Sequence, residues 1–245
     1  MTRTRRRRER LQSLGALAAG LAHEVKNPLS TMSVNLQLIA EDFADPQSSV
    51  EQRTRRRATL LLGEVERLDG IVNDFLSLAR GYEVTLQSVD LEQLVTNLLA
   101  FVQAENSQLG IETRSVLDPA ARWVVADPKF LRLALNHLVV NAQQAMSEQG
   151  GELLLETRAH DGEAEIRITD TGRGIAPQVL EKIWQPFYST KQGGTGLGLP
   201  TTRRILEECG GDVSVFSELG RGTRFTVRLP LLPKQLPGGS TETPS

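Results

Sequence analysis

Apolar residues repeat along the first eighty residues with the spacing of packed helices. In residues 10–43 they recur mostly at alternating steps of three and four, and residues 50–80 show the same steps. This heptad spacing places the apolar side chains on one face of each helix. The positions are Leu11, Leu14, Ala18, Leu21, Val25, Met32 and Ile39 in the first helix, and Leu61, Val65, Leu68, Val72, Phe75 and Ala79 in the second.

A short turn is expected between the two helices. Pro46 disfavours helical geometry in the residue before it, so the first helix should end near Asp45 and Gln47–Ser49 should form the turn. Pro28 is expected to kink the first helix. A lone hairpin leaves one face of each apolar seam in water, so we expect a homodimer that forms a four-helix bundle. The alternative is a monomeric hairpin packed on the rest of the chain.

From Val84 onward the pattern changes to short apolar runs that alternate with helical periodicity. Asp127-Pro128 indicates a helix start, because Asp caps the first N–H groups and Pro fits the first turn. Strands are predicted at 84–88, 111–117, 123–126, 152–159, 163–169, 212–217 and 223–229, and helices at 91–109, 128–146 and 199–209. This order predicts an α/β sandwich with one sheet backed by helices, so the whole chain is classed as α+β.

The net charge of −2 hides an asymmetry between two parts. Residues 1–82 hold 13 Lys and Arg against 10 Asp and Glu, whereas residues 83–245 hold 15 against 20. At roughly 150 residues per domain, the chain of 245 residues is predicted to contain domains at 1–82 and 83–232. The Pro-, Gly- and Ser-rich tail 233–245 is predicted to be disordered.

Composition narrows the compartment and the partners. Cys209 is the only cysteine, which excludes an intrachain disulfide and fits a reducing, cytoplasmic compartment. No apolar run approaches the roughly 18 residues of a membrane span. Six arginines lie between residues 3 and 10, but no aromatic residues interleave with them for base stacking. We therefore expect no nucleic-acid partner, and favour a solvated helix start or the juxtamembrane end of a truncated membrane sensor.

The first cluster with candidate chemistry is the segment His23–Leu29. His23 and Asn27 lie on the side of the helix opposite the seam, so both are expected to be exposed. An exposed imidazole beside the Glu24 carboxylate can act as a nucleophile or base. Asn27 stands where the zinc motif H-E-x-x-H has its second His, so zinc is not expected. The alternative is a surface histidine on a polar face.

Two further clusters lie in the second part of the chain, one within a predicted helix and one directly after a predicted strand. Asn141 is a polar residue in an apolar helix, and its carboxamide oxygen suits a hard cation such as Mg²⁺. His137 lies one turn earlier on the same face. Asp170 ends a strand, where it can accept a hydrogen bond from an amino group, and Gly172 and Gly174 let the backbone approach a ligand. The alternatives are an internal hydrogen bond and a simple turn.

The last cluster is the glycine-rich segment 193–199, which precedes a predicted helix. Backbone N–H groups at a helix N-terminus suit phosphate, and the glycines permit a mobile lid. The spacing G-x-G-x-G fits neither a Walker loop nor a dinucleotide fingerprint.

In this order the clusters resemble the catalytic core of the sensor histidine kinases of two-component systems, over about residues 11–230. His23–Leu29 resembles the H-box, and Asn141 lies in a segment similar to the N-box. The remaining matches are Asp170–Gly174 with the G1 box, Gly194–Leu199 with the G2 box, Pro186–Lys191 with the F-box of the nitrogen-regulation-type subfamily, and Gly220–Thr223 with Phe225 for the final strand turn.

The resemblance implies a Bergerat-type ATP-binding fold with ATP and Mg²⁺ as cofactors. It implies that His23 is phosphorylated, that Glu24 orients the imidazole or takes its proton, and that Asn27 positions water for phosphatase action. His137 stands where the family usually has Asn. The implied nucleotide site comprises His137, Asn141 as the Mg²⁺ ligand, Asp170 toward the adenine amino group, Gly172, Gly174, Lys191 near the terminal phosphates, Gly194, Thr195, Gly196, Leu197, Gly198 and Thr223.

The implied partner is the receiver domain of a response regulator, whose Asp accepts the phosphoryl group. The sequence contains no recognisable sensor, so sensing is expected from a separate partner or from a missing segment. Two alternatives remain open: a Bergerat-fold ATPase or Ser/Thr kinase, which leaves His23–Leu29 unexplained, and a nucleotide-binding adaptor without phosphotransfer.

Overall fold

The computed structural model describes residues 25–80, 83–191 and 194–232. The chain divides into two compact units. One comprises Met1–Glu83 and Gln185–Thr201, and the other comprises Val84–Trp184 and Thr202–Ser245. The predictions for His23, Glu24 and the tail lie outside the described residues.

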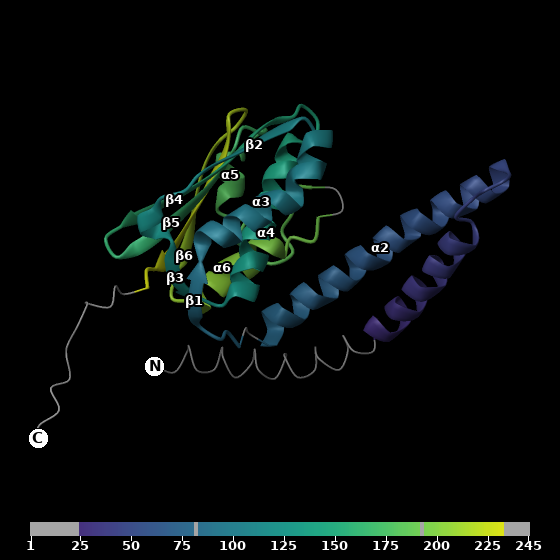
Figure 1. Ribbon diagram of the computed structural model, residues 1–245, viewed down its shortest axis with the longest axis horizontal. Coiled ribbons are helices and arrows are strands. Elements are labelled where there is room, and N and C mark those ends of the chain that lie inside the picture. The colour runs from purple at the N-terminus through teal and green to yellow at the C-terminus, as the bar shows by residue number, and fades with distance from the viewer. Residues whose placement is uncertain (1–24, 81–82, 192–193, 233–245) are drawn as a thin grey trace, which may run out of the picture. The chain divides into compact units, whose positions relative to one another are not determined.

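The helical hairpin has a helix over residues 25–42, a turn, and the long helix α2 (Ser49–Arg80) (Figure 1). The Ser48 hydroxyl accepts a hydrogen bond from the Glu51 N–H at 3.2 Å, and the Glu51 carboxylate accepts one from the Gln47 N–H at 2.6 Å. These side chains satisfy N–H groups at the start of α2, as capping residues do. The turn lies where the sequence predicted it, and the first helix continues through Pro28.

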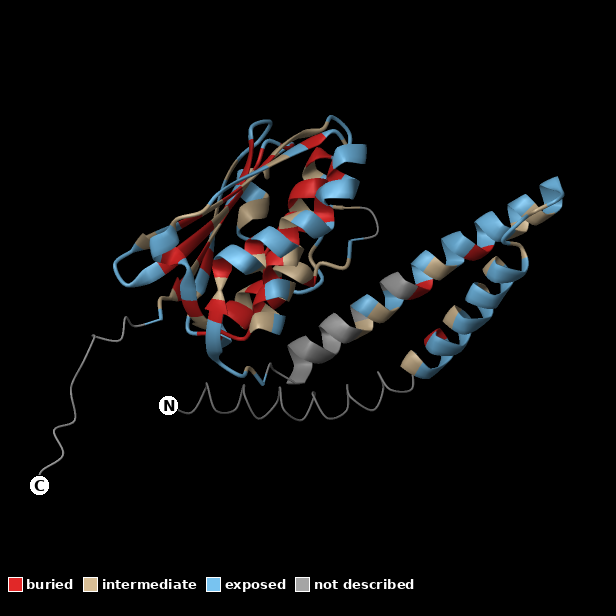
Figure 2. Cartoon of the chain, in the orientation of Figure 1, coloured by how far each residue is buried: buried red, intermediate tan, exposed pale blue. Residues whose placement is uncertain are grey.

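Among the hairpin side chains that the structure describes, few apolar ones are buried within one chain. Leu29, Ala58 and Val65 are buried, whereas the seam residues Met32 and Leu61 are 53% and 55% exposed (Figure 2). Exposed apolar side chains at helix-seam positions favour a further helical partner.

The second unit contains most of the strands and helices. Its elements are β1 (Gln87–Asp90), α3 (Leu91–Gln108), β2 (Ile111–Val116), the 3₁₀ helix η1 (Pro119–Ala121), β3 (Trp123–Ala126), α4 (Pro128–Met146), β4 (Gly151–His160), β5 (Glu163–Asp170), α5 (Pro177–Leu180), β6 (Asp212–Glu218) and β7 (Gly222–Pro230). Helix α6 (Gly198–Glu208) begins in the segment Gln185–Thr201 and continues into this unit. The predicted sandwich of strands and helices is confirmed.

The described residues form two sheets, whereas the sequence predicted one. Five strands run in the order β2-β4-β5-β7-β6, in which only β2 and β4 are parallel, and β1 pairs with β3 in a separate two-stranded sheet. The first strand was predicted at 84–88 but lies at Gln87–Asp90, because Gln87 pairs with Ala126 and Asp90 is already the cap of α3. The short elements η1 and α5 were not predicted, since four residues or fewer show no periodicity.

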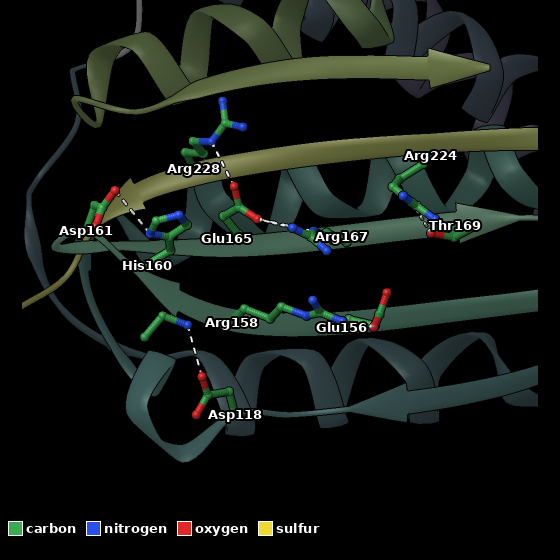
Figure 3. Close-up of polar contacts among 11 residues, drawn as sticks. Asp118, Glu156, Arg158, His160, Asp161, Glu165, Arg167, Thr169, Arg224 and Arg228 are labelled. Carbon is green, nitrogen blue, oxygen red and sulfur yellow. Dashed lines mark hydrogen bonds and ion pairs between the residues drawn. The ribbon is translucent and has the colours of Figure 1, made fainter.

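The core lies between the five-stranded sheet and the helices α3 and α4 (Figures 1 and 2). On β5, Ala164, Ile166 and Ile168 are buried in this core, as alternation along a strand requires. The opposite face carries charged residues, with Glu165 accepting from Arg167 at 2.6 Å and from Arg228 at 3.0 Å (Figure 3). Burial tends to raise the pKa of Glu165, but the hydrogen bonds from the two arginines outweigh it and lower that pKa below its ordinary value.

Candidate active site

Helix α4 is anchored at its N-terminus by a buried carboxylate. Asp127 Oδ1 accepts from the backbone N–H groups of Lys129 and Phe130 at 3.0 and 3.3 Å. Its Oδ2 accepts from the Thr85 N–H at 2.9 Å. The predicted start at Asp127-Pro128 and the predicted end at Met146 are both confirmed.

Two candidate nucleotide-binding residues lie one turn apart on α4. Leu138, Val139 and Ala142 are buried, whereas His137 and Asn141 are half-buried. The Thr202 hydroxyl on α6 donates to the Ala134 carbonyl at 3.3 Å and lies 3.5 Å from His137 Nδ1. This contact holds the His137 side of α4 against α6, and Thr202 was not identified from the sequence.

Asp170 lies at the end of β5, next to α4 in the same unit. Asp170 is 4% exposed, and its Oδ1 accepts from the Gly172 N–H at 2.9 Å. Thr223 lies directly opposite on β7 and is also buried. The Thr223 hydroxyl is 2.9 Å from Ser217 Oγ, which accepts from the Ile175 N–H at 2.8 Å. Ser217 therefore ties the loop after Asp170 to the turn between β6 and β7, and the sequence did not single it out.

The glycines of the Asp170–Gly174 loop allow close packing of protein segments. A Cβ on Gly172 would lie 2.7 Å from the Ala145 Cβ on α4. Gly174 has a φ of +69°, and a Cβ there would overlap the Glu218 carbonyl. Both glycines therefore pack against protein atoms, and their predicted approach to a ligand stays a prediction. Because Ala145 is one turn beyond Asn141, the loop and the Asn141 segment are brought together.

The segment Gln185–Thr201 folds back on itself. The Phe187 N–H donates to the Gly196 carbonyl at 3.1 Å, and a Cβ on Gly196 would lie 2.6 Å from the Phe187 carbonyl carbon. The Lys191 N–H donates to Ser189 Oγ at 3.1 Å. Leu197 is fully buried, and its N–H donates to the Thr195 hydroxyl at 3.2 Å. The part that resembles the F-box therefore packs against the glycine part, and Gly193 lies outside the described residues.

The residues fit a nucleotide with a hydrated cation. Among the described residues no three His, Cys, Asp or Glu side chains form a group that could hold a metal ion. Mg²⁺ commonly retains waters and takes one or two protein oxygens together with substrate phosphates, and the Asn141 carboxamide oxygen is a ligand atom of the type that Mg²⁺ accepts. A buried carboxylate such as Asp170 suits an amino group as a hydrogen-bond donor.

Comparison with known families defines the class of this protein. Residues 126–233 match the histidine kinase-, DNA gyrase B- and HSP90-like ATPase family, and residues 13–81 match the His Kinase A (phospho-acceptor) domain. The chain carries both domains of the sensor histidine kinases and is homologous to them. The predicted resemblance and the predicted fold class are confirmed.

Particular relatives agree with this assignment. Sensor histidine kinase ZraS of Salmonella typhi is 34% identical over 230 residues, which are 94% of this chain and 48% of ZraS. Histidine-protein kinase AtoS of Escherichia coli K12 is 34% identical over 92% of this chain and 36% of AtoS. The chain thus spans half or less of the length of these relatives. The crystal structure of full-length ShkA in complex with AMPPNP matches with a TM-score of 0.75 and 29% identity, over 88% of this chain and 46% of ShkA.

No helix among the described residues combines the length and the hydropathy that a membrane span requires.

Proposed function

We propose that this chain is an ATP-dependent protein histidine kinase that phosphorylates its own His23. One observation carries the proposal: a phospho-acceptor domain and an ATPase domain lie in the same chain, and the first contains the sequence His23-Glu24-x-x-Asn27. A Bergerat-fold ATPase or Ser/Thr kinase accounts for the second domain alone. Residues 1–82 are the dimerisation and phosphotransfer domain, and residues 83–232 are the catalytic domain.

ATP is the phosphoryl donor, which is consistent with the AMPPNP bound by ShkA. Asp170 accepts a hydrogen bond from the adenine amino group, and Lys191 lies near the terminal phosphates. Asn141 is the protein ligand of Mg²⁺, which offsets phosphate charge when bound. The other residues of the nucleotide site are those implied by the family resemblance, with His137 in place of the usual Asn.

His23 acts as the nucleophile in its neutral form. An imidazole nitrogen forms a bond to the γ-phosphorus of ATP, the bond from that phosphorus to the bridging oxygen breaks, and ADP leaves. Glu24 orients the ring and accepts the proton released from the imidazole. Positioning and electrostatic stabilisation supply most of the catalysis, and the glycine segment excludes water from the phosphates.

The phosphoryl group then passes to an Asp of a response-regulator receiver domain. Asn27 is exposed on the first helix, as a residue that orients water for dephosphorylation of that Asp requires. The exposed seam residues Met32 and Leu61 favour a homodimer. We place this core in the cytoplasm, with a separate sensor module as a further partner.

Radiolabelling tests the proposal directly. The full chain is incubated with [γ-³²P]ATP and Mg²⁺, and the labelled residue is mapped. We expect an acid-labile label that is lost in His23→Gln and kept in His160→Gln, a matched change at the exposed histidine that ends β4. An acid-stable label, or release of inorganic phosphate alone, would contradict the kinase.

A further inference from the structure

Trp184 occupies a defined place immediately before the segment Gln185–Thr201. Its ring meets the Phe225 ring edge-on, with the centroids 6.3 Å apart and the planes at 87°. Phe225 is a core residue of β7 and is 4% exposed. The five-stranded sheet therefore fixes the position of the indole, because an edge-to-face pair of aromatic rings is an oriented contact.

Arg203 stacks on this indole from the other end of the segment. Its guanidinium carbon lies 4.0 Å from the centroid of the Trp184 ring. Arg203 is on α6, two residues after the segment ends. Among the described residues Arg203 makes no ion pair with a carboxylate, so the ring is the contact that orients it.

The pair therefore joins the two ends of a segment that contains Lys191 and Gly194–Gly198. Closing a loop at its base removes conformations that the loop otherwise samples. A glycine-rich segment has the most conformations to lose. A segment held at both ends binds a ligand with a smaller entropic cost than one that is free at its base.

We propose that Trp184 and Arg203 form a clasp that preorganises the segment Gln185–Thr201 for nucleotide binding. The benefit to nucleotide affinity rests on the proposed kinase function, whereas the restraint on the segment does not. Both residues act by positioning the segment, and neither is assigned a contact with the nucleotide.

The chain contains a matched pair for comparison. The Arg122 guanidinium carbon lies 5.6 Å from the ring centroid of Trp123, the other tryptophan. Trp123 is the first residue of β3 and Arg122 directly precedes it, so this pair does not border the segment. Trp184→Leu and Trp123→Leu thus remove the same ring from an Arg–Trp pair at two places, and only the first removes the clasp.

Two measurements on the full chain test the clasp. Calorimetric titration with Mg²⁺ and AMPPNP gives the Kd, and limited trypsin digestion followed by mass spectrometry gives the rate of cleavage after Lys191. In Arg203→Ala and Trp184→Leu we expect the Kd to rise about 2- to 30-fold, as expected for loss of a cation–π contact, with faster cleavage after Lys191. Arg203→Lys should recover part of both effects, and Trp123→Leu should change neither.

The outcomes distinguish loss of the clasp from a loss of overall stability, and failure of the clasp proposal from failure of the kinase proposal. If Arg203→Ala leaves both the Kd and the cleavage rate at wild-type values, the clasp is wrong, even if the melting temperature falls. Should Trp184→Leu fail to fold, Arg203→Ala and Arg203→Lys decide alone, because Arg203 is not fully buried. If the wild-type chain binds no AMPPNP, the kinase proposal fails, and the cleavage rates still decide whether the segment is restrained.

Discussion

Gln143 on α4 donates a hydrogen bond of 2.7 Å to the side-chain carbonyl of Asn106 on α3. Asn106 in turn donates to the Thr113 hydroxyl on β2 at 2.8 Å. Gln143 is 4% exposed and Asn106 is fully buried. These two hydrogen bonds connect α4 to α3 and α3 to β2. Gln143, the α4 residue in this network, lies two residues beyond Asn141. The network therefore positions the part of α4 that contains Asn141, the proposed Mg²⁺ ligand.

Replacing Gln143 by Leu should lower the free energy of unfolding by about 1–3 kcal/mol. The physical reason is that the buried Asn106 carbonyl loses a donor and cannot turn to water. Urea denaturation measures the effect. Gln144→Leu, on the exposed neighbouring position, is the matched control and should stay within about 0.5 kcal/mol of wild type. Equal losses in the two variants would show that the network adds nothing.

A methyl group at Gly172 should disturb the loop after β5. The added Cβ would lie 2.7 Å from Ala145 Cβ and 2.7 Å from the Ala145 carbonyl oxygen, so the loop must move away from α4. We expect Gly172→Ala to cost about 1–3 kcal/mol of stability and to weaken AMPPNP binding in calorimetry. Gly63→Ala on α2 adds the same methyl where no atom lies within 4 Å, and should be neutral or stabilising. A Gly172→Ala chain with wild-type stability and affinity would contradict the packing argument.

Charge at Glu165 should make stability depend on pH. The arginine contacts lower the pKa of Glu165 in the folded chain, so the carboxylate stays ionised to a lower pH when folded than when unfolded. Its contribution is complete above the unfolded-state pKa and is lost as the pH falls through the folded-state pKa. Glu165→Gln should therefore be less stable than wild type at pH 7, and the gap should narrow below about pH 4.

Urea denaturation from pH 3 to pH 7 measures this gap. Glu163→Gln, at an exposed position two residues earlier on β5, should show a smaller gap at pH 7. A gap for Glu165→Gln that widens on acidification would reverse the sign of the argument.

Asp170→Asn should separate nucleotide binding from folding. Asn keeps the shape of the side chain and an acceptor for the Gly172 N–H, but it lacks the charge that strengthens a hydrogen bond from an amino group. We expect the Kd for Mg²⁺ and AMPPNP to rise about tenfold or more, equivalent to about 1.4 kcal/mol or more. Asp161→Asn, in the exposed β4–β5 turn, should leave the Kd unchanged. Unaltered affinity in Asp170→Asn would remove Asp170 from the site.

Most elements were predictable because each depends on neighbouring residues. The start of α4 follows from Asp127 and Pro128, and its observed bounds equal the predicted ones. Helix α3 differs by one residue at its end. The first strand was displaced because its limits depend on pairing with β3, which lies far along the chain. Periodicity reports local geometry and carries no information about which distant strand is the partner.

The candidate site was predictable in its residue types and less so in its contacts. Asn141 and Asp170 were selected as polar residues next to apolar elements, and α4 and the loop after β5 do pack together. Gly172 and Gly174 were selected for approach to a ligand, which stays a prediction, and their close packing against Ala145 and Glu218 was not foreseen. Gln143 stands among apolar residues of α4 in the same way as Asn141, and that signal alone could have identified it.

The sequence by itself determined the type and approximate limits of the long elements and the order of the motifs, because these follow from residues close together in the chain. The tertiary structure decided the strand order β2-β4-β5-β7-β6, the separation of β1 and β3, and the contacts of Gln143 with Asn106 and of Trp184 with Arg203. Asn106 lies 37 residues before Gln143. Such pairs form only when whole elements pack, since packing brings distant residues together and fixes the register between them.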